Sequence, residues 1–353
     1  MIPIASPCFQ GNEVEYLLDC VQSGYVSNGG DYVNMLETEA GRVVNTEYVV
    51  ATMSGTTALF VALKALGIGQ GDKVAIPAIT YIATANAVTM TGAEPYLIDI
   101  NLSNLTMNTL CLEEALSEIK IDAIMPVHLL GACPDMYSII KLGQLFDIPV
   151  VADAACALDY ETYEADFTVF SLNATKTITA GTGGLLITNK DELYLKARDL
   201  AGTCKIGDEY MHYGIGYNLG MSNIHAAIGL AQLEHLDHNL RLKDTLYDLY
   251  YDKLVDVDGI YFFNKPETPW LTAIYFATDS DYLDLVQGAL AHKGVTSRVL
   301  WRPIHLQAPY YELETSSLEV SEMIWRRSLL LPSGVALKPT DIEDICEIIK
   351  GAI

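Results

Sequence analysis

The first half of the chain alternates between short apolar runs and longer stretches in which apolar residues recur every three or four positions. Short apolar runs bounded by turn-forming residues predict β-strands, and the amphipathic stretches between them predict α-helices. The predicted strands are Tyr48–Thr52, Lys73–Ile76, Glu94–Ile98, Ala123–Pro126, Pro149–Ala152, Phe167–Phe170 and Leu185–Thr188. The predicted helices include Thr56–Leu66, Ile82–Met90, Leu112–Ile119 and Met136–Phe146. This alternation predicts an α/β fold with a mainly parallel seven-stranded sheet covered by helices.

The two ends of the chain lack this alternation. The first 45 residues carry two helical patterns and no strong strand, and a long helical pattern from about Ser222 to Val255 indicates a hinge. The remainder has fewer strands and ends in a predicted helix over Asp341–Ile349. We therefore predict a large domain with the N-terminal segment over 1–239 and a smaller C-terminal α+β domain over 240–353.

The balance of charge excludes some classes of partner. Of the 353 residues, 21 are basic and 45 acidic, which gives a net charge of −24. Nucleic acid and anionic membrane surfaces need a basic footprint, so neither is expected as a partner. A single anionic small molecule can still be held by a few local cations and helix N-termini. Seven scattered cysteines without a C-x-x-C pair, no membrane-length apolar run and no basic leader together predict a cytoplasmic protein.

Lys176 is the most informative residue of the chain. It stands between the predicted strand Phe167–Phe170 and a glycine-rich turn. Such a lysine is a poor choice for packing, but it suits an amine that must lose its proton and attack an aldehyde. Asp153 ends another apolar run, so we expect its carboxylate at the same edge of the sheet, although a turn or helix cap would explain it alone. A lysine and an aspartate placed in this way fit pyridoxal phosphate, the first for a Schiff base and the second for the pyridinium nitrogen.

A short segment after the first strand predicts a phosphate site. Gly55 lets the backbone approach an anion, and Thr56 and Thr57 offer N–H groups and hydroxyls at a helix N-terminus. Taken alone, the segment is more simply an ordinary helix cap. Because Ser171 and Lys176 are predicted at the same edge of the sheet, we favour phosphate binding.

Other side chains give weaker signals. Tyr81 follows a strand at the same edge and could stack on a cofactor ring, although one of 21 tyrosines is more often core. His235 and His238 share a helix face, where a solvated polar surface is a better explanation than a metal site, and no metal is expected. A cluster near the C-terminus could meet a substrate phosphate or carboxylate, with packing on a domain surface as an equal alternative. Its members are Arg298, Trp301, Arg302 and His305.

The chain resembles, over nearly its whole length, the DegT-like family of fold-type I, pyridoxal phosphate-dependent sugar-nucleotide aminotransferases. The matching segments are Gly11–Glu13, Ser23–Ser27, Gly55–Leu59, Thr80–Thr84, Val127–Gly131, Asp153–Ala155, Ser171–Lys176 with Gly183 and Gly184, Gly216–Asn218, Met221–Ile224, Ala226–Leu233 and Pro303–Gln307.

The resemblance implies a role for each matching position. Lys176 would form the Schiff base and then carry the proton to the substrate carbon. Asp153 would contact the pyridine nitrogen, and Tyr81 would stack on the ring. The phosphate would be held by Thr56, Thr57, Ser171 and an Asn218 that reaches over from a second subunit. The implied unit is a two-fold homodimer with shared active sites.

Three positions depart from the family pattern. Cys156 replaces the usual Gln or Glu three residues after the aspartate, close to the cofactor. Thr182 replaces Glu in the Gly-Glu-Gly-Gly turn, and Gly220 replaces the Arg of Asn-x-Arg-Met. The first bears on the tuning of the cofactor, and the other two bear on substrate contacts.

The resemblance also implies the reaction, which is transfer of an amino group from glutamate to a nucleotide-linked 4-keto-6-deoxy sugar for polysaccharide or glycan biosynthesis. The N-terminal and Pro303–Gln307 segments favour a UDP-linked 4-keto-6-deoxy-N-acetylhexosamine, and GDP-4-keto-6-deoxymannose, as in perosamine formation, is the first alternative. A sugar dehydratase of the same fold is a second alternative, which Lys176 opposes because those relatives carry histidine there. A non-catalytic regulator is a third, left open by Cys156 and Gly220.

Overall fold

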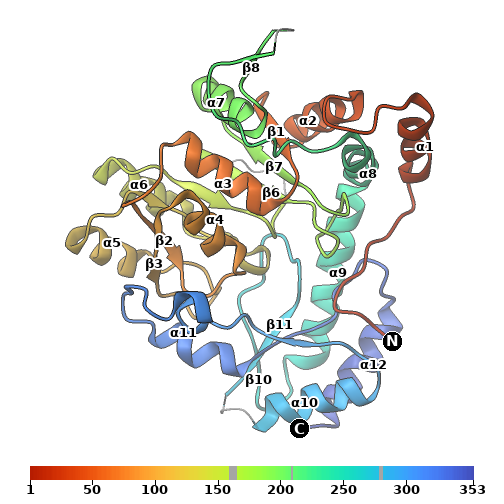
Figure 1. Cartoon of the computed structure of the whole chain (residues 1–353). Coiled ribbons are helices and arrows are strands. Elements are labelled where there is room, and N and C mark those ends of the chain that lie inside the picture. The colour runs from red at the N-terminus through yellow and green to blue at the C-terminus, as the bar shows by residue number, and fades with distance from the viewer. Residues whose placement is uncertain (159–164, 208–209, 278–280) are drawn as a thin grey trace.

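A seven-stranded sheet forms the centre of the molecule. The computed structural model describes residues 1–158, 165–207, 210–277 and 281–353 (Figure 1). Two hydrogen-bonded groups of strands, β3-β2-β4 and β5-β6-β7-β1, are joined by parallel bridges between Ile124 and Val150 and between Val127 and Asp153. β7 is antiparallel to both of its neighbours, whereas the other paired strands are parallel. The strands are β1 (Val49–Thr52), β2 (Lys73–Pro77), β3 (Glu94–Ile98), β4 (Ala123–Ile124), β5 (Val151–Asp153), β6 (Phe167–Ser171) and β7 (Gly184–Ile187). The predicted α/β fold with a mainly parallel seven-stranded sheet is confirmed.

Alternating side chains of these strands enter two different cores, because successive residues of a strand point to opposite faces. On one face Val50, Val169 and Leu186 pack with helices α3 (Gly55–Ala65), α4 (Ala83–Thr91) and α7 (Asp191–Ala201). On the other face Phe170 and Leu185 pack with α2 (Asp31–Val43) and α8 (Asn223–Leu233). Farther along that second face lie α5 (Thr109–Glu118) and α6 (Met136–Phe146). The helices therefore cover both faces of the sheet, as the apolar strands require.

The long helical pattern at Ser222–Val255 is two helices, not one. α8 ends at Leu233 and α9 (Leu236–Leu254) begins three residues later. At the break, the Glu234 carboxylate accepts hydrogen bonds from Asn12 Nδ2 at 2.8 Å and Tyr16 Oη at 2.7 Å. Both donors lie at α1 (Glu13–Ser23), so the N-terminal segment packs where the helix is interrupted.

The C-terminal part contains a second, antiparallel sheet of order β10-β11-β13-β12. Its strands are β10 (Ile260–Phe262), β11 (Ala273–Phe276), β12 (Arg298–Val299) and β13 (Ser328–Leu330), and its helices are α10 (Asp281–His292), α11 (Glu319–Ile324) and α12 (Pro339–Lys350). α9 runs from the large sheet to this region (Figure 1) and packs on α12. The domain division predicted between 239 and 240 stays a prediction and falls inside α9.

Short elements complete the chain. They are β8 (Lys205–Ile206), β9 (Met211–His212) and the 3-10 helices Leu129–Gly131, Ile304–Leu306, Ala308–Tyr310 and Trp325–Arg327. Among the helices that the structure describes, none has the length and apolar character needed to cross a membrane.

Candidate active site

A cavity of about 530 Å³ lies at the carboxyl ends of the central strands. In parallel sheets this edge is where ligands bind. The predicted site residues that line the cavity are Gly55, Thr56, Tyr81, Asp153, Cys156, Ser171, Lys176, Arg298 and Trp301. The predicted site residues that are not among its lining are Thr57, Asn218, Arg302 and His305.

The amine of Lys176 lies between a thiol and an aromatic ring. Its Nζ donates to Cys156 Sγ at 3.1 Å and lies 3.9 Å from the centroid of the Trp270 ring. Burial raises the pKa of the Cys156 thiol, and the nearby Lys176 amine opposes that shift. A neutral thiol is a weak hydrogen-bond partner, so the amine has no strong competitor for a ligand at this position.

Asp153 is the last residue of β5 and is almost completely buried. Its Oδ2 accepts from the Thr84 hydroxyl at 2.7 Å, and its Oδ1 accepts from the Ala155 amide at 3.1 Å. Burial raises the pKa of the carboxyl, while these two hydrogen bonds and the charge of Lys176 act in the opposite direction. A buried carboxylate of this kind is stabilised by a cationic partner, and a protonated pyridine nitrogen would supply one.

The N-terminus of α3 provides a fitting place for a phosphate. A Cβ added to Gly55 would lie 3.2 Å from Ser171 Cβ, and one added to Gly184 would lie 2.5 Å from the Ser54 carbonyl oxygen. The two glycines therefore let α3 begin directly against the strand ends of β6 and β7. The exposed amides and the dipole at the start of this 11-residue helix favour an anion beside Ser171.

The structure turns Thr57 away from this place. Its amide donates to Ser54 Oγ at 3.2 Å and its hydroxyl oxygen accepts from the Ser54 amide at 3.0 Å, and these two bonds form a capping box. The hydroxyl also donates to the Ser54 carbonyl at 2.8 Å. The Thr57 hydroxyl therefore stabilises the helix start, and its predicted contact with a phosphate stays a prediction. Thr56 remains at the cavity. The helix cap is confirmed for Ser54 and Thr57, and the anion site at Gly55 and Thr56 stays a prediction.

Tyr81 is 61% exposed and lines the cavity, so the alternative that it belongs to the core is wrong. Its ring is available to stack on a ligand. Asn218 has a left-handed φ of 54°, and its Oδ1 accepts from Asn28 Nδ2 at 3.2 Å. Its predicted reach into a second subunit stays a prediction.

The C-terminal cluster is divided by the structure. Arg298 lies on β12 and lines the cavity together with Trp301, whose ring stacks on Trp270 at 6.0 Å between centroids. Arg302 instead lies over the Trp325 ring at 5.8 Å, and His305 Nε2 is 3.1 Å from Glu322 Oε1. Within this chain the four side chains therefore face different neighbours, and their predicted contact with a substrate stays a prediction.

Sequence reasoning missed two residues that shape the site. Trp270 lies against Lys176 and on Trp301, although it is far from both in the sequence. Thr84 holds the carboxylate of Asp153 and is itself paired with the Thr80 hydroxyl at 2.8 Å. Thr84 stood in a segment that resembled the family, whereas nothing in the local pattern marks Trp270.

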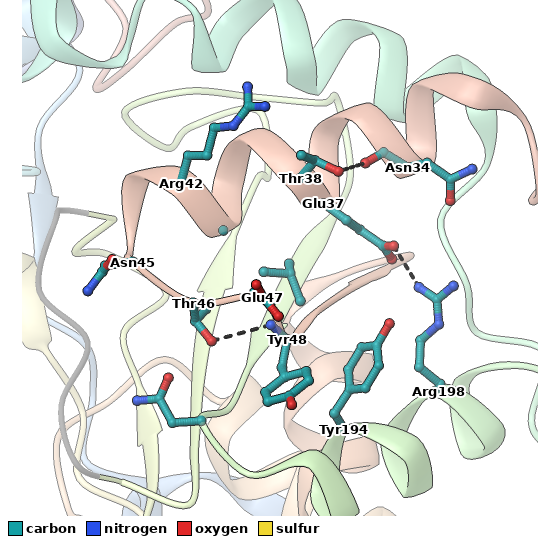
Figure 2. Close-up of a pocket in the computed structure, with 13 residues that line it drawn as sticks. Asn34, Glu37, Thr38, Arg42, Asn45, Thr46, Glu47, Tyr48, Tyr194 and Arg198 are labelled. Atoms are coloured by element: carbon teal, nitrogen blue, oxygen red, sulfur yellow. Dashed lines mark hydrogen bonds and ion pairs between the residues drawn. The ribbon is translucent and has the colours of Figure 1, made fainter.

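A larger and more open pocket of about 680 Å³ lies between α2, β1 and α7 (Figure 2). Its partly buried carboxylate, Glu37, is paired with Arg198 at 2.6 Å and accepts from the Ala51 amide at 2.8 Å. Burial raises the pKa of Glu37, and Arg198 opposes this shift. None of the predicted site residues lines this pocket in the described part of the chain, and its central ion pair is satisfied internally. The smaller cavity around Lys176 is therefore the one arranged for chemistry.

Comparison with known proteins gives one consistent result. The model of the DegT/DnrJ/EryC1/StrS aminotransferase family matches residues 7–350. GDP-perosamine synthase of Caulobacter vibrioides is 34% identical over 360 residues, which cover 98% of this chain and 96% of that protein. GDP-perosamine synthase of Escherichia coli O157:H7 is 33% identical over 358 residues, which cover 99% of this chain and 98% of that protein. Among solved structures, the putative sugar aminotransferase Spr1654 from Streptococcus pneumoniae in its PLP-form has a TM-score of 0.91 at 25% identity, covering 99% of this chain and 98% of that chain.

Proposed function

This chain belongs to the DegT/DnrJ/EryC1/StrS aminotransferase family, and from this premise we propose that it transfers an amino group from glutamate to C4 of GDP-4-keto-6-deoxymannose. The protein is a sugar aminotransferase, and its cofactor is pyridoxal phosphate. The relatives named GDP-perosamine synthase support the GDP-linked substrate over the UDP-linked N-acetylhexosamine that the sequence segments favoured. The order of those two substrate predictions is therefore reversed.

One observation carries the proposal: Lys176 and Asp153 line a single cavity that also reaches Gly55 at the start of α3 and Ser171 at the end of β6. Pyridoxal phosphate, when bound, supplies an electron-withdrawing ring that stabilises negative charge on the carbon carrying the amino group. The chain's residues supply the rest. Lys176 Nζ holds the cofactor and then takes and returns the proton at the substrate carbon. The buried Asp153 carboxylate keeps a proton on the ring nitrogen, and the start of α3 binds the phosphate.

A second element of the proposal is a two-fold homodimer with shared active sites. Large apolar side chains are exposed on or just after α1 and near β9, and such groups favour burial in an interface. They are Val14, Leu18, Val21, Tyr25, Tyr210, Met211, Tyr213 and Ile215. Asn218, close to the second group, is the residue we expect to enter the cavity of the partner. The cytoplasmic location stays a prediction.

To test this, the purified protein is mixed with pyridoxal phosphate, glutamate and one keto-sugar nucleotide, and the release of 2-oxoglutarate is measured. We expect GDP-4-keto-6-deoxymannose to exceed UDP-4-keto-6-deoxy-N-acetylhexosamine in kcat/KM by about a hundredfold or more, because a site built for one base leaves polar groups unpaired with another. The Lys176→Ala variant is the control and should release nothing. Equal or greater use of the UDP-linked sugar would overturn the choice of nucleotide, and no release with either would overturn the reaction.

A further inference from the structure

A second lysine, Lys243, is buried behind the cavity wall. It lies on α9, is 3% exposed, and its Nζ donates to the carbonyl of Trp270 at 2.8 Å and to the carbonyl of Ser333. Trp270 lines the cavity, and the Ser333 amide donates to the carbonyl of Ile4, another lining residue, at 2.9 Å. The amine thus joins the segments of Trp270 and Ser333, and the second of these holds Ile4 at the cavity.

Trp270, whose carbonyl is bound by Lys243, contacts Lys176 directly. Trp270 places its ring 3.9 Å from Lys176 Nζ and donates from Nε1 to the Thr175 carbonyl at 2.8 Å. Asn239, one turn before Lys243 on α9, donates to the Thr177 carbonyl at 3.2 Å. The carbonyls on both sides of Lys176 are therefore held by groups that depend on α9.

The chemistry of this buried amine matches its two partners. A neutral amine has two N–H donors, and the carbonyls of Trp270 and Ser333 take both, whereas an ammonium group brings a third donor. Burial, together with the charge of Lys176, lowers the pKa of Lys243 to about 7, and Cys156 acts in the opposite direction. On α9 itself, Tyr250 faces the same segment and donates to the Pro332 carbonyl at 2.8 Å. Near neutral pH Lys243 can therefore serve as an uncharged donor.

We propose that Lys243 is a positioning residue for the amino transfer, which holds the Trp270 carbonyl so that the indole ring stays against the Lys176 amine. The proposal rests on the function proposed above for Lys176. Loss of the two donors would let this wall of the cavity relax, together with the loop on either side of Lys176, and a small misplacement of a reacting amine is costly. Since the amine acts through Trp270, its effect must vanish when the indole is absent.

The test measures covalent capture of the cofactor rather than turnover. The full-length protein is stripped of cofactor and mixed with pyridoxal phosphate, imines are trapped by borohydride, and the modified Lys176 peptide is quantified by mass spectrometry. We expect Lys243→Met to slow trapping at Lys176 about tenfold, as for the loss of a buried hydrogen-bond donor, and Lys243→Gln to restore most of the rate because its amide keeps two uncharged N–H donors. Lys253→Met, on an exposed lysine of the same helix, should behave as the unmodified protein.

Each outcome decides between the proposals. Trapping in Lys243→Met within twofold of the unmodified protein would overturn the positioning role, as would equal slowing by Met and Gln. Absence of trapping at Lys176 in the unmodified protein would overturn the proposed function instead. Should Lys243→Met not fold, Lys243→Leu, which also lacks the donors, is compared with and without Trp270→Ala: slowing that disappears without the indole supports the proposal, and equal slowing in both overturns it.

Discussion

The burial of Lys243 predicts a pH-dependent difference in stability between the cofactor-free protein and its Lys243→Met variant. In the fold, burial and the charge of Lys176 lower the pKa of this lysine from 10.5 to about 7. In the unfolded chain the group returns to about 10.4. Between these two values the unfolded state binds more protons than the folded state. The free energy of unfolding therefore rises with pH in this window, at up to about 1.36 kcal/mol for each pH unit.

The magnitude follows from the same two values. Below pH 7 the lysine is charged in both states, and the fold carries the whole cost of burying the charge, on the order of 5 kcal/mol. Above pH 10.5 the cost is gone. From pH 7.5 to 9 the protein should gain about 2 kcal/mol of stability relative to Lys243→Met, because methionine has a similar length and does not titrate.

Urea unfolding at several pH values measures this difference, with Lys253→Met as the matched control. Lys253 lies on the same helix but is 40% exposed in an ion pair with Glu343, so its removal should leave the pH dependence unchanged. A stability difference between the protein and Lys243→Met that stays constant within about 0.5 kcal/mol over the range would refute the reasoning. It would mean that the lysine remains charged in the fold.

Three further predictions compare neighbouring residues with different surroundings. Arg298→Met should raise KM for the keto-sugar nucleotide about tenfold, because it removes a cation from the cavity, whereas Arg302→Met should leave KM unchanged. Steady-state kinetics measure both KM values, and equal values for the two variants would contradict the division of the cluster. Gly55→Ala should weaken binding of pyridoxal phosphate about tenfold, because its Cβ would crowd Ser171, and fluorescence titration can check this. Thr57→Val should leave that affinity intact and cost about 1 kcal/mol of stability through the lost cap, which thermal unfolding can check. Cys156→Ala should keep kcat within about threefold, since a neutral thiol is a weak partner for Lys176, and a loss beyond about thirtyfold would show that the thiol acts in the reaction.

The central sheet could be predicted because its strands are apolar on both faces and separated by clear turn signals. All seven predicted strands are present, and the helix predicted at Met136–Phe146 has those bounds in the structure. Strand ends follow less closely from the sequence: β4 is regular only over Ala123–Ile124, and its pairing with β5 continues as isolated bridges. The interruption between α8 and α9 escaped prediction because Glu234 and His235 fit a helical pattern. At this interruption the Glu234 carboxylate is bound by Asn12 and Tyr16 of the N-terminal segment, which lie far away in the sequence.

Within the site, the residues that could be predicted are those whose chemistry is unusual for their position. A lysine beside glycines and an aspartate at the end of an apolar run stand out in a sequence, and both line the cavity. The sequence does not distinguish Thr56 from Thr57, because each residue of a helix turns the side chain by about 100° and only the cap shows which threonine faces inward.

Lys243 illustrates the opposite case, since it belongs to an amphipathic helix in which a lysine ordinarily marks the solvated face. Its neighbours in the sequence, Leu242 and Asp244, give no sign that it is 3% exposed. The burial arises only when the carbonyls of Trp270 and Ser333, from two different segments, converge on α9. A group that acts on Lys176 through another residue leaves no motif near Lys176 itself. Positioning residues of this kind are therefore found from unexpected burial and hydrogen bonding rather than from spacing along the chain.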